Sequence, residues 1–248
     1  MGELTGKKTL VAGASRGLGR GIAEAFASAG ASVVAVARDT GPLAQLAADR
    51  DLVHLETGDV SDPLVAGKLL ERHRPDVLAL VAGATPLLRP IHHHTWESFS
   101  ANWDTDVRMT FHWLREALLL PLAPGSRIIV MSSGAALNGS PLSGGYAGAK
   151  ATQRFMADYA AQESRRAGLG ISVTAVLPRL TAATELGRPA VAAYAARSGL
   201  TEDEFLRRMG DPVTPATAGA AFLQLACGGP DTEAAAYMLT GGGLETLT

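Results

Sequence analysis

A tyrosine and a lysine four residues apart, Tyr146 and Lys150, follow Ser133 in this chain, which stands thirteen residues before the tyrosine. Residues four apart on a helix share a face, so the phenol and the ammonium are predicted to lie side by side. A free tyrosine gives up its proton only near about pH 10, and a cation beside it favours the phenolate. Tyr146 could therefore exchange a proton nearer to neutral pH. Taken alone, a Tyr-x-x-x-Lys pair more often marks a solvated helix edge, so its meaning depends on the rest of the sequence.

A glycine-rich loop between a strand and a helix is the second signal. Lys8-Thr9-Leu10-Val11-Ala12 is an apolar run of strand type, and Gly13-Ala-Ser-Arg-Gly17-Leu-Gly19 follows it directly. The next residues place Ile22, Ala25 and Phe26 on one helical face. Glycines allow a sharp turn and close approach of the backbone, and a helix N-terminus offers N–H groups to a pyrophosphate. The alternative is an ordinary turn between a strand and a helix.

Segments of strand type and helix type alternate along the chain. Continuous apolar runs such as Val33-Val34-Ala35-Val36 are typical of buried parallel strands. Strands are expected near residues 8–12, 31–37, 52–57, 76–82, 126–132, 170–177 and 235–240, and helices near 17–29, 42–49, 62–73, 95–120, 143–168, 188–208 and 214–227. This pattern predicts an α/β fold, a Rossmann-like doubly wound parallel sheet of about seven strands with helices on both faces. No repeat or linker divides the chain, so residues 1–248 are expected to form a single domain.

The spacing G-x-x-x-G-x-G, together with Ser133, Tyr146 and Lys150, resembles the short-chain dehydrogenase/reductase family. The resemblance covers nearly the whole chain and implies a dinucleotide-binding catalytic domain, with residues 185–212 as a substrate lid. It also implies assembly into a homodimer or homotetramer. At the matched positions it implies that the cofactor is bound by Gly13, Ser15, Arg16, Gly17, Leu18, Gly19, Arg38, Asp59, Val60, Ala82, Gly83, Tyr146, Lys150 and Thr181. The implied catalytic residues are Ser133, Tyr146, Lys150 and Asp106.

The end of the second strand bears on the choice of cofactor. In such folds an acidic residue there binds the ribose of NAD, whereas an arginine accommodates the 2′-phosphate of NADP. Here Ala37 stands at the acidic position and Arg38 follows it, while Arg16 in the glycine loop offers a second guanidinium. Asp39 is the contrary sign, because a shift of one residue would place it on the ribose. The sequence favours NADP(H).

Two polar features of the family's cofactor site are apolar here. The threonine before the first glycine is Ala12, and the family's Asn-Asn-Ala-Gly reads Leu80-Val81-Ala82-Gly83. In the family, polar contacts join these two places. Losing both partners together is milder than leaving one buried group unpaired. We interpret the change as a repacking that keeps the cofactor site.

Asp106 aligns with the family's catalytic asparagine, which helps to hold a water that links the lysine to solvent. An aspartate could support such a relay through its backbone carbonyl. If its carboxylate lies close, it would stabilise the Lys150 ammonium and weaken its pull on the Tyr146 phenolate. Two alternatives stay open: Asn102, one turn earlier, is the matching residue, or Asp106 is an ordinary residue on a helix surface.

The turn after the sixth strand is a further departure from the family. Arg179 follows Pro178 where the family has glycine, and it could reach a cofactor phosphate, an acidic substrate group or solvent. Thr184 is an alternative to Thr181 for contact with the cofactor.

Composition excludes several classes of function. With 47% apolar residues and a mean hydropathy of +0.13 the chain suits a globular domain, and a net charge of −2 gives no sign of nucleic acid or an anionic membrane as partner. No apolar run reaches the roughly 18–20 residues of a membrane span. The single cysteine, Cys227, fits a reducing compartment, and we expect a cytoplasmic protein. His92-His93-His94 lacks the further ligands of a metal site, so no metal is expected.

These residues together predict NADPH-dependent reduction of a ketone or aldehyde carbonyl to an alcohol, or the reverse oxidation. Tyr146 would supply the proton, Ser133 would orient the carbonyl oxygen, and Lys150 would assist Tyr146 and hold the nicotinamide ribose. One alternative is a dehydratase or epimerase that uses NADP(H) differently, as the altered Asp106 and Arg179 suggest. Another is a non-catalytic regulator that binds NADP, since a fold alone does not fix a function.

Overall fold

Parallel strands form the centre of the protein. At one place in the sheet the connections that leave two neighbouring strands run to opposite sides. The computed structural model describes residues 2–48, 52–228 and 234–247. The strands are β1 (Lys8–Ala12), β2 (Ser32–Ala37), β3 (Val53–Thr57), β4 (Val77–Leu80), β5 (Arg127–Met131), β6 (Ser172–Pro178), β7 (Ala236–Thr240) and β8 (Gly243–Thr246). They form one sheet in the order β3-β2-β1-β4-β5-β6-β7-β8. β2 and β3 lie on one side of β1, and β4 to β8 lie on the other. The connection from β1 to β2 and the connection from β4 to β5 therefore run in opposite directions, which creates the switch point where such folds bind ligands.

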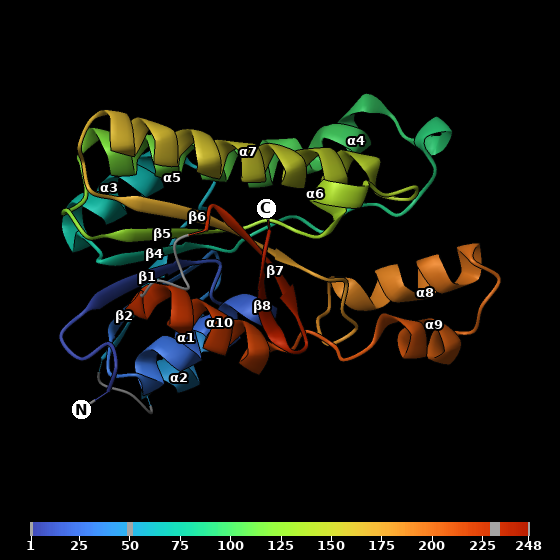
Figure 1. The fold of residues 1–248 in the computed structure, drawn as a ribbon, viewed down its shortest axis with the longest axis horizontal. Helices are drawn as coiled ribbons and strands as arrows, with labels where there is room; N and C mark the ends of the chain where they lie inside the picture. Colours follow the sequence, from blue (N-terminus) through green and yellow to red (C-terminus); the bar gives the residue numbers. More distant parts are fainter. Residues whose placement is uncertain (1, 49–51, 229–233, 248) are drawn as a thin grey trace.

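Helices cover both faces of this sheet (Figure 1). The helices are α1 (Gly17–Ser28), α2 (Ala44–Ala48), α3 (Pro63–His73), α4 (Trp96–Asn102), α5 (Arg108–Leu119), α6 (Ala135–Asn138), α7 (Gly144–Arg166), α8 (Gly187–Arg197), α9 (Glu202–Met209) and α10 (Pro215–Cys227). On one face α1, α2 and α10 pack against the sheet, and on the other α3, α5 and α7 do so. The predicted doubly wound α/β fold is confirmed.

The strands are buried because side chains of both faces enter a core. Along β2, Val33 and Ala35 pack with the α1 side, whereas Val34 and Val36 pack with the α3 side. A strand that is covered on both faces needs apolar residues at every position, which is why these segments could be found as continuous apolar runs. The pattern recurs in β5, where Ile128 to Val130 are buried.

An eighth strand was not predicted. β8 pairs with β7 in antiparallel fashion, with Thr240 opposite Gly243 across a tight turn. Its four residues, Gly-Leu-Glu-Thr, are half-buried or exposed, so they carry none of the apolar signal of the parallel strands. The strand exists because it covers the edge of β7.

Two of the predicted helices are interrupted. The helix expected at 95–120 is α4 and α5 with a π-helical turn, Trp103–Val107, between them. The helix expected at 188–208 divides into α8 and α9, because Gly199 has φ +65° and Thr201 caps α9 through a capping box with Glu204.

Other expectations differ from the structure or lie partly outside the described residues. The short helix α6 was not predicted. The last residue of the helix expected at 42–49 lies outside the described residues, as do residues 1, 50, 51, 229–233 and 248 of the expected single domain. That domain and the proposed lid at 185–212 stay predictions, although α8 and α9 do project beyond the sheet in Figure 1.

Glycines let the first and the last helices approach closely. A Cβ on Gly21 of α1 would overlap the Pro215 carbonyl oxygen, and one on Gly219 of α10 would lie 2.6 Å from the Gly21 carbonyl oxygen. The two helices therefore pack backbone to backbone beside the core that contains Ile22 and Phe222. Among the helices that the structure describes, none has the length and apolarity needed to cross a lipid bilayer.

Candidate active site

A cleft of about 1050 Å³ runs along the carboxyl ends of the parallel strands. Residues just beyond β1, β2, β4 and β5 supply its walls, as expected of a ligand site in an open α/β sheet. It is lined by each residue predicted to bind the cofactor, namely Gly13, Ser15, Arg16, Gly17, Leu18, Gly19, Arg38, Asp59, Val60, Ala82, Gly83, Tyr146, Lys150 and Thr181. Ser133 lines it as well, whereas Asp106 is fully buried.

The glycine loop needs glycine at two points. Gly13 has φ +98°, a conformation that L side chains rarely adopt, and a Cβ there would lie 2.7 Å from the Ala82 Cβ. A Cβ on Gly19 would overlap the Gly13 carbonyl oxygen. Helix α1 then begins at Gly17, and no side chain caps its first N–H groups. The loop thus combines a close backbone approach with N–H donors, which suits a pyrophosphate.

The polar link of the family between the glycine loop and β4 is replaced by main-chain bonds. The Ala12 carbonyl oxygen accepts hydrogen bonds from the N–H groups of Val81 (3.0 Å) and Ala82 (2.9 Å). The side chains of Ala12 and Leu80 are fully buried in the core. Among the described residues, the buried side-chain polar atoms without a hydrogen-bond partner include none in residues 12–19 or 80–83, so the apolar residues leave no buried side-chain group of this loop unpaired.

Guanidinium groups lie at the end of the cleft next to β2. Arg16 and Arg38 are both exposed, and Arg16 forms an ion pair with Glu185. Asp39 instead turns back on its own chain, where its carboxylate accepts the Gly41 N–H at 2.9 Å. Hydrogen bonds from Ser61 to the Asp59 carboxylate hold the pKa of Asp59 below its ordinary value, and the charge of Arg38 acts in the same direction. The glycine cradle and the uncapped helix start fit the pyrophosphate of a nicotinamide dinucleotide.

Ser133, Tyr146 and Lys150 all line the cleft, and Ser133 follows the end of β5. Ser132 donates a hydrogen bond from its hydroxyl to the Lys150 carbonyl oxygen at 2.7 Å, which ties α7 to the end of the strand. The neighbouring Ser133 hydroxyl oxygen accepts the Ala135 N–H at 3.2 Å, so its own proton is available to the cleft. Lys150 Nζ lies 5.4 Å from the centroid of the Tyr146 ring. Tyr146 and Lys150 come from α7, and Ser133 comes from the segment between β5 and α6.

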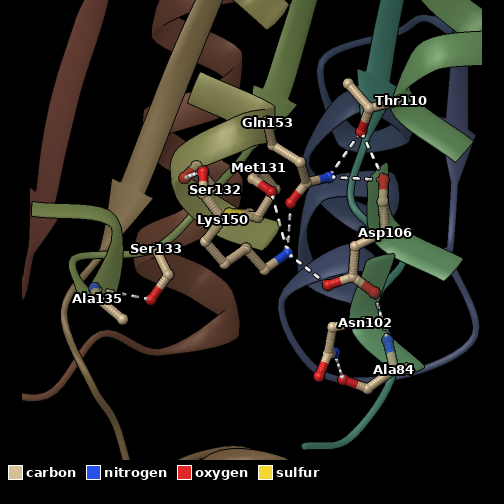
Figure 2. Close-up of polar contacts among 10 residues, drawn as sticks. All are labelled: Ala84, Asn102, Asp106, Thr110, Met131, Ser132, Ser133, Ala135, Lys150 and Gln153. Atoms are coloured by element: carbon tan, nitrogen blue, oxygen red, sulfur yellow. Dashed lines mark hydrogen bonds and ion pairs between the residues drawn. The ribbon is translucent and has the colours of Figure 1, made fainter. Parts of the chain in front are cut away.

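Figure 2 shows that the Lys150 ammonium is surrounded by protein acceptors. Its Nζ lies 2.8 Å from Gln153 Oε1, 3.1 Å from Asp106 Oδ2 and 3.4 Å from the Met131 carbonyl oxygen. The contacts with Gln153 and Met131 are hydrogen bonds, whereas the contact with Asp106 is an ion pair, and Asp106 Oδ2 has no hydrogen-bond partner among the described residues. The Gln153 amide in turn donates to the Asp106 carbonyl oxygen at 3.1 Å and to Thr110 Oγ1 at 2.6 Å. Gln153 and Thr110 were not singled out in the sequence.

Lys150 is charged despite its burial. Desolvation acts to lower the pKa of the lysine, but the charges of Asp106 and then Tyr146, with the contact to Asp106, raise it above the ordinary value. Both partners of the pair are buried, with 4% of the Lys150 side chain and none of the Asp106 side chain exposed. A buried pair of this kind carries no net charge.

The π-helical turn explains how Asp106 faces inward. One carboxylate oxygen, Oδ1, accepts the Ala84 N–H at 2.8 Å, and the other meets Lys150. Asn102, one turn earlier, donates to the Ala84 carbonyl oxygen at 2.8 Å instead. Asp106 rather than Asn102 is therefore the residue beside Lys150, and the alternative of an exposed Asp106 is wrong. Its backbone carbonyl, considered as a relay, is occupied by Gln153 and Thr110.

Residues of α8 and α9 close the far end of the cleft. Tyr194, Phe205 and Met209 line it, and the Tyr194 hydroxyl bonds to Ser140 and, at 3.2 Å, to Ser143. These hydroxyls join α8 to the loop before α7. They were not predicted from the sequence, because nothing in it indicates that residues 140 and 194 meet.

The turn after β6 contributes both polar and charged groups. The Thr181 hydroxyl donates to the Val213 carbonyl oxygen at 2.7 Å, and the Thr184 hydroxyl oxygen accepts the Gly187 N–H at 3.0 Å. Both side chains thus hold the local fold while lining the cleft. Arg179 lines the cleft and is exposed.

Comparison with known proteins bears on this arrangement. Residues 7–195 match the family described as short chain dehydrogenase. The chain is 30% identical over 226 residues to a 2-keto-3-deoxy-L-fuconate dehydrogenase of Xanthomonas campestris, a match that covers 85% of this chain and 71% of that protein. Matches cover between 53% and 71% of the curated relatives, so the chain spans less than two thirds of several of them.

Solved structures agree on the fold. A 3-ketoacyl-(acyl-carrier-protein) reductase from Brucella melitensis, complexed with NADH, superposes with a TM-score of 0.78 at 22% identity. A short chain dehydrogenase from Burkholderia cenocepacia in complex with NADP gives 0.78 at 24% identity. Each comparison covers 96% of this chain and 98% of the other. With the family match over residues 7–195, the chain belongs to the short-chain dehydrogenase family.

Proposed function

We propose that this protein is an NADPH-dependent reductase that converts a ketone or aldehyde carbonyl to an alcohol, or catalyses the reverse oxidation. One observation carries the proposal: Tyr146 and Lys150 lie side by side, with the ammonium 5.4 Å from the ring centroid, and line the same cleft as Ser133. When bound, the nicotinamide supplies or accepts the hydride.

The side chains then have distinct tasks. Tyr146 gives its phenolic proton to the substrate oxygen during reduction and takes it back during oxidation. Ser133 donates a hydrogen bond to that oxygen, which polarises the carbonyl and fixes its orientation. Lys150 holds positive charge behind the phenol. Lys150 would also hold the ribose of the nicotinamide when the cofactor is bound.

Selection of NADPH over NADH follows from the charges at the β2 end. A 2′-phosphate meets the exposed Arg38 and, beside it, Arg16 of the glycine loop. The Asp39 carboxylate accepts a hydrogen bond from the Gly41 N–H. This supports the choice of NADPH, because this carboxylate is then not available to the ribose of NAD. Assembly into a homo-oligomer and a cytoplasmic location stay predictions.

The first test is a titration with NADPH and NADH, followed by nucleotide fluorescence, on wild type, Arg38→Ala and Arg165→Ala. Arg165 is an exposed arginine at the end of α7 and serves as the matched control. We expect Arg38→Ala to weaken NADPH binding about tenfold or more and to leave NADH binding within about twofold. Binding of neither nucleotide to wild type would contradict the proposal, and equal loss for both nucleotides would contradict the role of Arg38.

A second candidate is an enzyme that dehydrates or epimerises its substrate with bound NADP(H). The buried Asp106–Lys150 pair favours it, because the lysine is not held in the way the family pattern implies. Product formation without net consumption of NADPH, followed by the nucleotide fluorescence, would identify this chemistry. A regulator without catalysis would keep its biological effect in Tyr146→Phe.

A further inference from the structure

We infer that Arg179 and Arg208 bind a carboxylate of the substrate, so that the carbonyl compound reduced in this cleft is an oxo acid whose carboxylate lies a few bonds from the carbonyl. The inference rests on the proposed function for the reaction itself. It adds the charge and the chemical class of the substrate, and it assigns the selection of that class to the two arginines.

The backbone of Arg179 is fixed beside Ser133. The Gly134 N–H donates to the Pro178 carbonyl oxygen at 2.9 Å. The Arg179 N–H donates to the Leu239 carbonyl oxygen of β7, also at 2.9 Å. A Cβ on Gly134 would lie 3.9 Å from the Arg179 Cα. Arg179 therefore begins next to the residue proposed to orient the substrate oxygen, and its side chain lines the cleft.

Arg208 enters the same cleft from α9. Helices α8 and α9 lie side by side beyond the sheet (Figure 1). The Thr181 hydroxyl donates to the Val213 carbonyl oxygen at 2.7 Å. Thr181 stands two residues after Arg179, and Val213 stands five residues after Arg208. This hydrogen bond holds the turn after β6 against the segment after α9, and so keeps the two arginines on adjoining parts of the cleft wall.

Arg179 and Arg208 differ from the other cations that line the cleft. Each of the others has a carboxylate nearby, in the pairs Arg16–Glu185, Lys150–Asp106 and Arg38–Asp59. In the part of the chain that the structure describes, neither Arg179 nor Arg208 has an ion pair or a side-chain hydrogen bond. This end of the cleft therefore carries two positive charges without a partner, although the whole chain has a net charge of −2.

A cofactor phosphate is the other anion that could use these arginines. The turn after β6 approaches the glycine loop at Thr184, where a Cβ on Gly17 would lie 3.6 Å from Thr184 Cγ2. The pyrophosphate is expected on that loop, and the 2′-phosphate is proposed to lie at Arg38. Arg179 instead lies beside Ser133, where the carbonyl is expected. Its position therefore favours a carboxylate of the substrate.

An arginine suits this task because its planar guanidinium can donate two parallel hydrogen bonds to one carboxylate. With the carboxylate on Arg179 and the carbonyl oxygen on Ser133, the substrate is held at two points. During reduction the hydride of NADPH adds to the carbonyl carbon, and the proton of Tyr146 passes to the carbonyl oxygen. The carboxylate takes no part in the bond changes, so the product is a hydroxy acid of the same charge.

Binding to the enzyme–NADP⁺ complex tests the inference without turnover, because oxidised cofactor has no hydride to give. The probes are pyruvate, acetoacetate and levulinate, each compared with its methyl ester by calorimetry. Wild type should bind at least one acid about tenfold or more tighter than its ester, and Arg179→Ala and Arg208→Ala should each reduce this preference. Both arginines are exposed, so the variants should fold. Equal binding of acids and esters by wild type overturns the inference.

Matched variants separate charge, position and cofactor. Arg207 of α9 is exposed, is not among the described residues that line the cleft, and donates from Nε to the Asp203 carbonyl oxygen of its own helix at 3.3 Å. Arg207→Ala should therefore keep the preference for acids. Arg179→Lys retains the charge without the paired hydrogen bonds, so it should keep only part of the preference.

NADPH affinity identifies the anion that Arg179 serves. Measured by nucleotide fluorescence, it should stay within about twofold in Arg179→Ala. A loss of NADPH binding as large as the loss of acid binding would assign Arg179 to a cofactor phosphate and overturn the inference. If an acid binds as expected but is not reduced with NADPH, the proposed function fails and the carboxylate site stands. If ketones are reduced without preference for acids, the proposed function stands and the inference fails.

Discussion

Arg16 Nη1 lies 2.6 Å from Glu185 Oε2, so an ion pair joins the glycine loop to the segment just before α8. Both residues line the cleft, and both are exposed, at 64% and 76% of their side chains. The Glu185 carboxylate occupies the guanidinium that a 2′-phosphate is proposed to use. An anionic cofactor and Glu185 therefore compete for Arg16.

Glu185→Gln should tighten NADPH binding by about two- to fivefold, because an exposed ion pair is weak and its loss frees Arg16 for the phosphate. NADH binding should change less. Nucleotide fluorescence titration measures both, and added salt should shrink the difference. Glu202→Gln, an exposed carboxylate at the start of α9, is the control. Weaker NADPH binding in Glu185→Gln would mean that the carboxylate supports the site instead.

Tyr146→Phe should lower kcat of carbonyl reduction by about 10²- to 10⁴-fold, the usual range for loss of a general acid. The phenol is half-buried and no hydrogen bond in the described structure depends on it, so the fold should be kept and NADPH affinity should fall far less than kcat. Steady-state kinetics and nucleotide titration on one preparation separate the two effects. Tyr159→Phe, which alters an exposed ring on the same helix, should leave both unchanged. Full activity in Tyr146→Phe would remove Tyr146 from the mechanism.

Two glycine-to-alanine changes should act in opposite directions on stability. Gly21→Ala drives a methyl group into the Pro215 carbonyl between α1 and α10, and we expect a loss of about 2 kcal/mol or more. Gly67→Ala, in α3, meets its nearest atom only at 3.9 Å, and we expect a gain of about 0.5–1 kcal/mol from reduced backbone entropy. Urea unfolding followed by circular dichroism gives both values. Equal effects would mean that the close approach of α1 and α10 is not needed.

The contribution of Glu56 to stability should disappear in acid. Burial of its carboxylate acts to raise its pKa, but hydrogen bonds from His73 and Arg72 outweigh this and hold the pKa below the ordinary value. A depressed folded pKa stabilises the fold above the unfolded pKa, and this is lost as the pH falls through the folded value. The melting temperature of Glu56→Gln should therefore lie below that of wild type at about pH 7 and approach the wild-type value at about pH 3.5. Glu71→Gln, exposed on α3, should show no such convergence.

The sequence was sufficient to predict those elements in which every position has the same environment. The parallel strands are covered on both faces, so the buried residues Val33 to Ala37 of β2 had to be apolar, and the Gly13–Gly19 loop had to be glycine-rich to approach the residues after β4. The sequence also contains the signals that separate α8 from α9, namely Gly199 and the Thr201–Glu204 capping box, although one continuous helix was expected there.

Other features depend on contacts between distant segments. Whether Asp106 faces Lys150 is decided by a π-helical turn, which no local pattern indicated, and the role of Gln153 depends on Thr110 of α5 lying against α7. Gln153 stands three residues after Lys150, and that spacing was the one signal that could have found it. β8 carried no apolar pattern, because its function is to pair with an edge.

The backbone contact between α1 and α10 also has a consequence for synthesis on the ribosome. About 190 residues separate Ser28 from Pro215, and at roughly 5–20 residues per second the first helix waits about 10–40 seconds for its partner. During that time Ile22 and Phe26 lack the cover that α10 provides in the finished protein. The nascent chain is thus most exposed to aggregation at its earliest-made helix, and chaperone binding there should end when α10 leaves the exit tunnel.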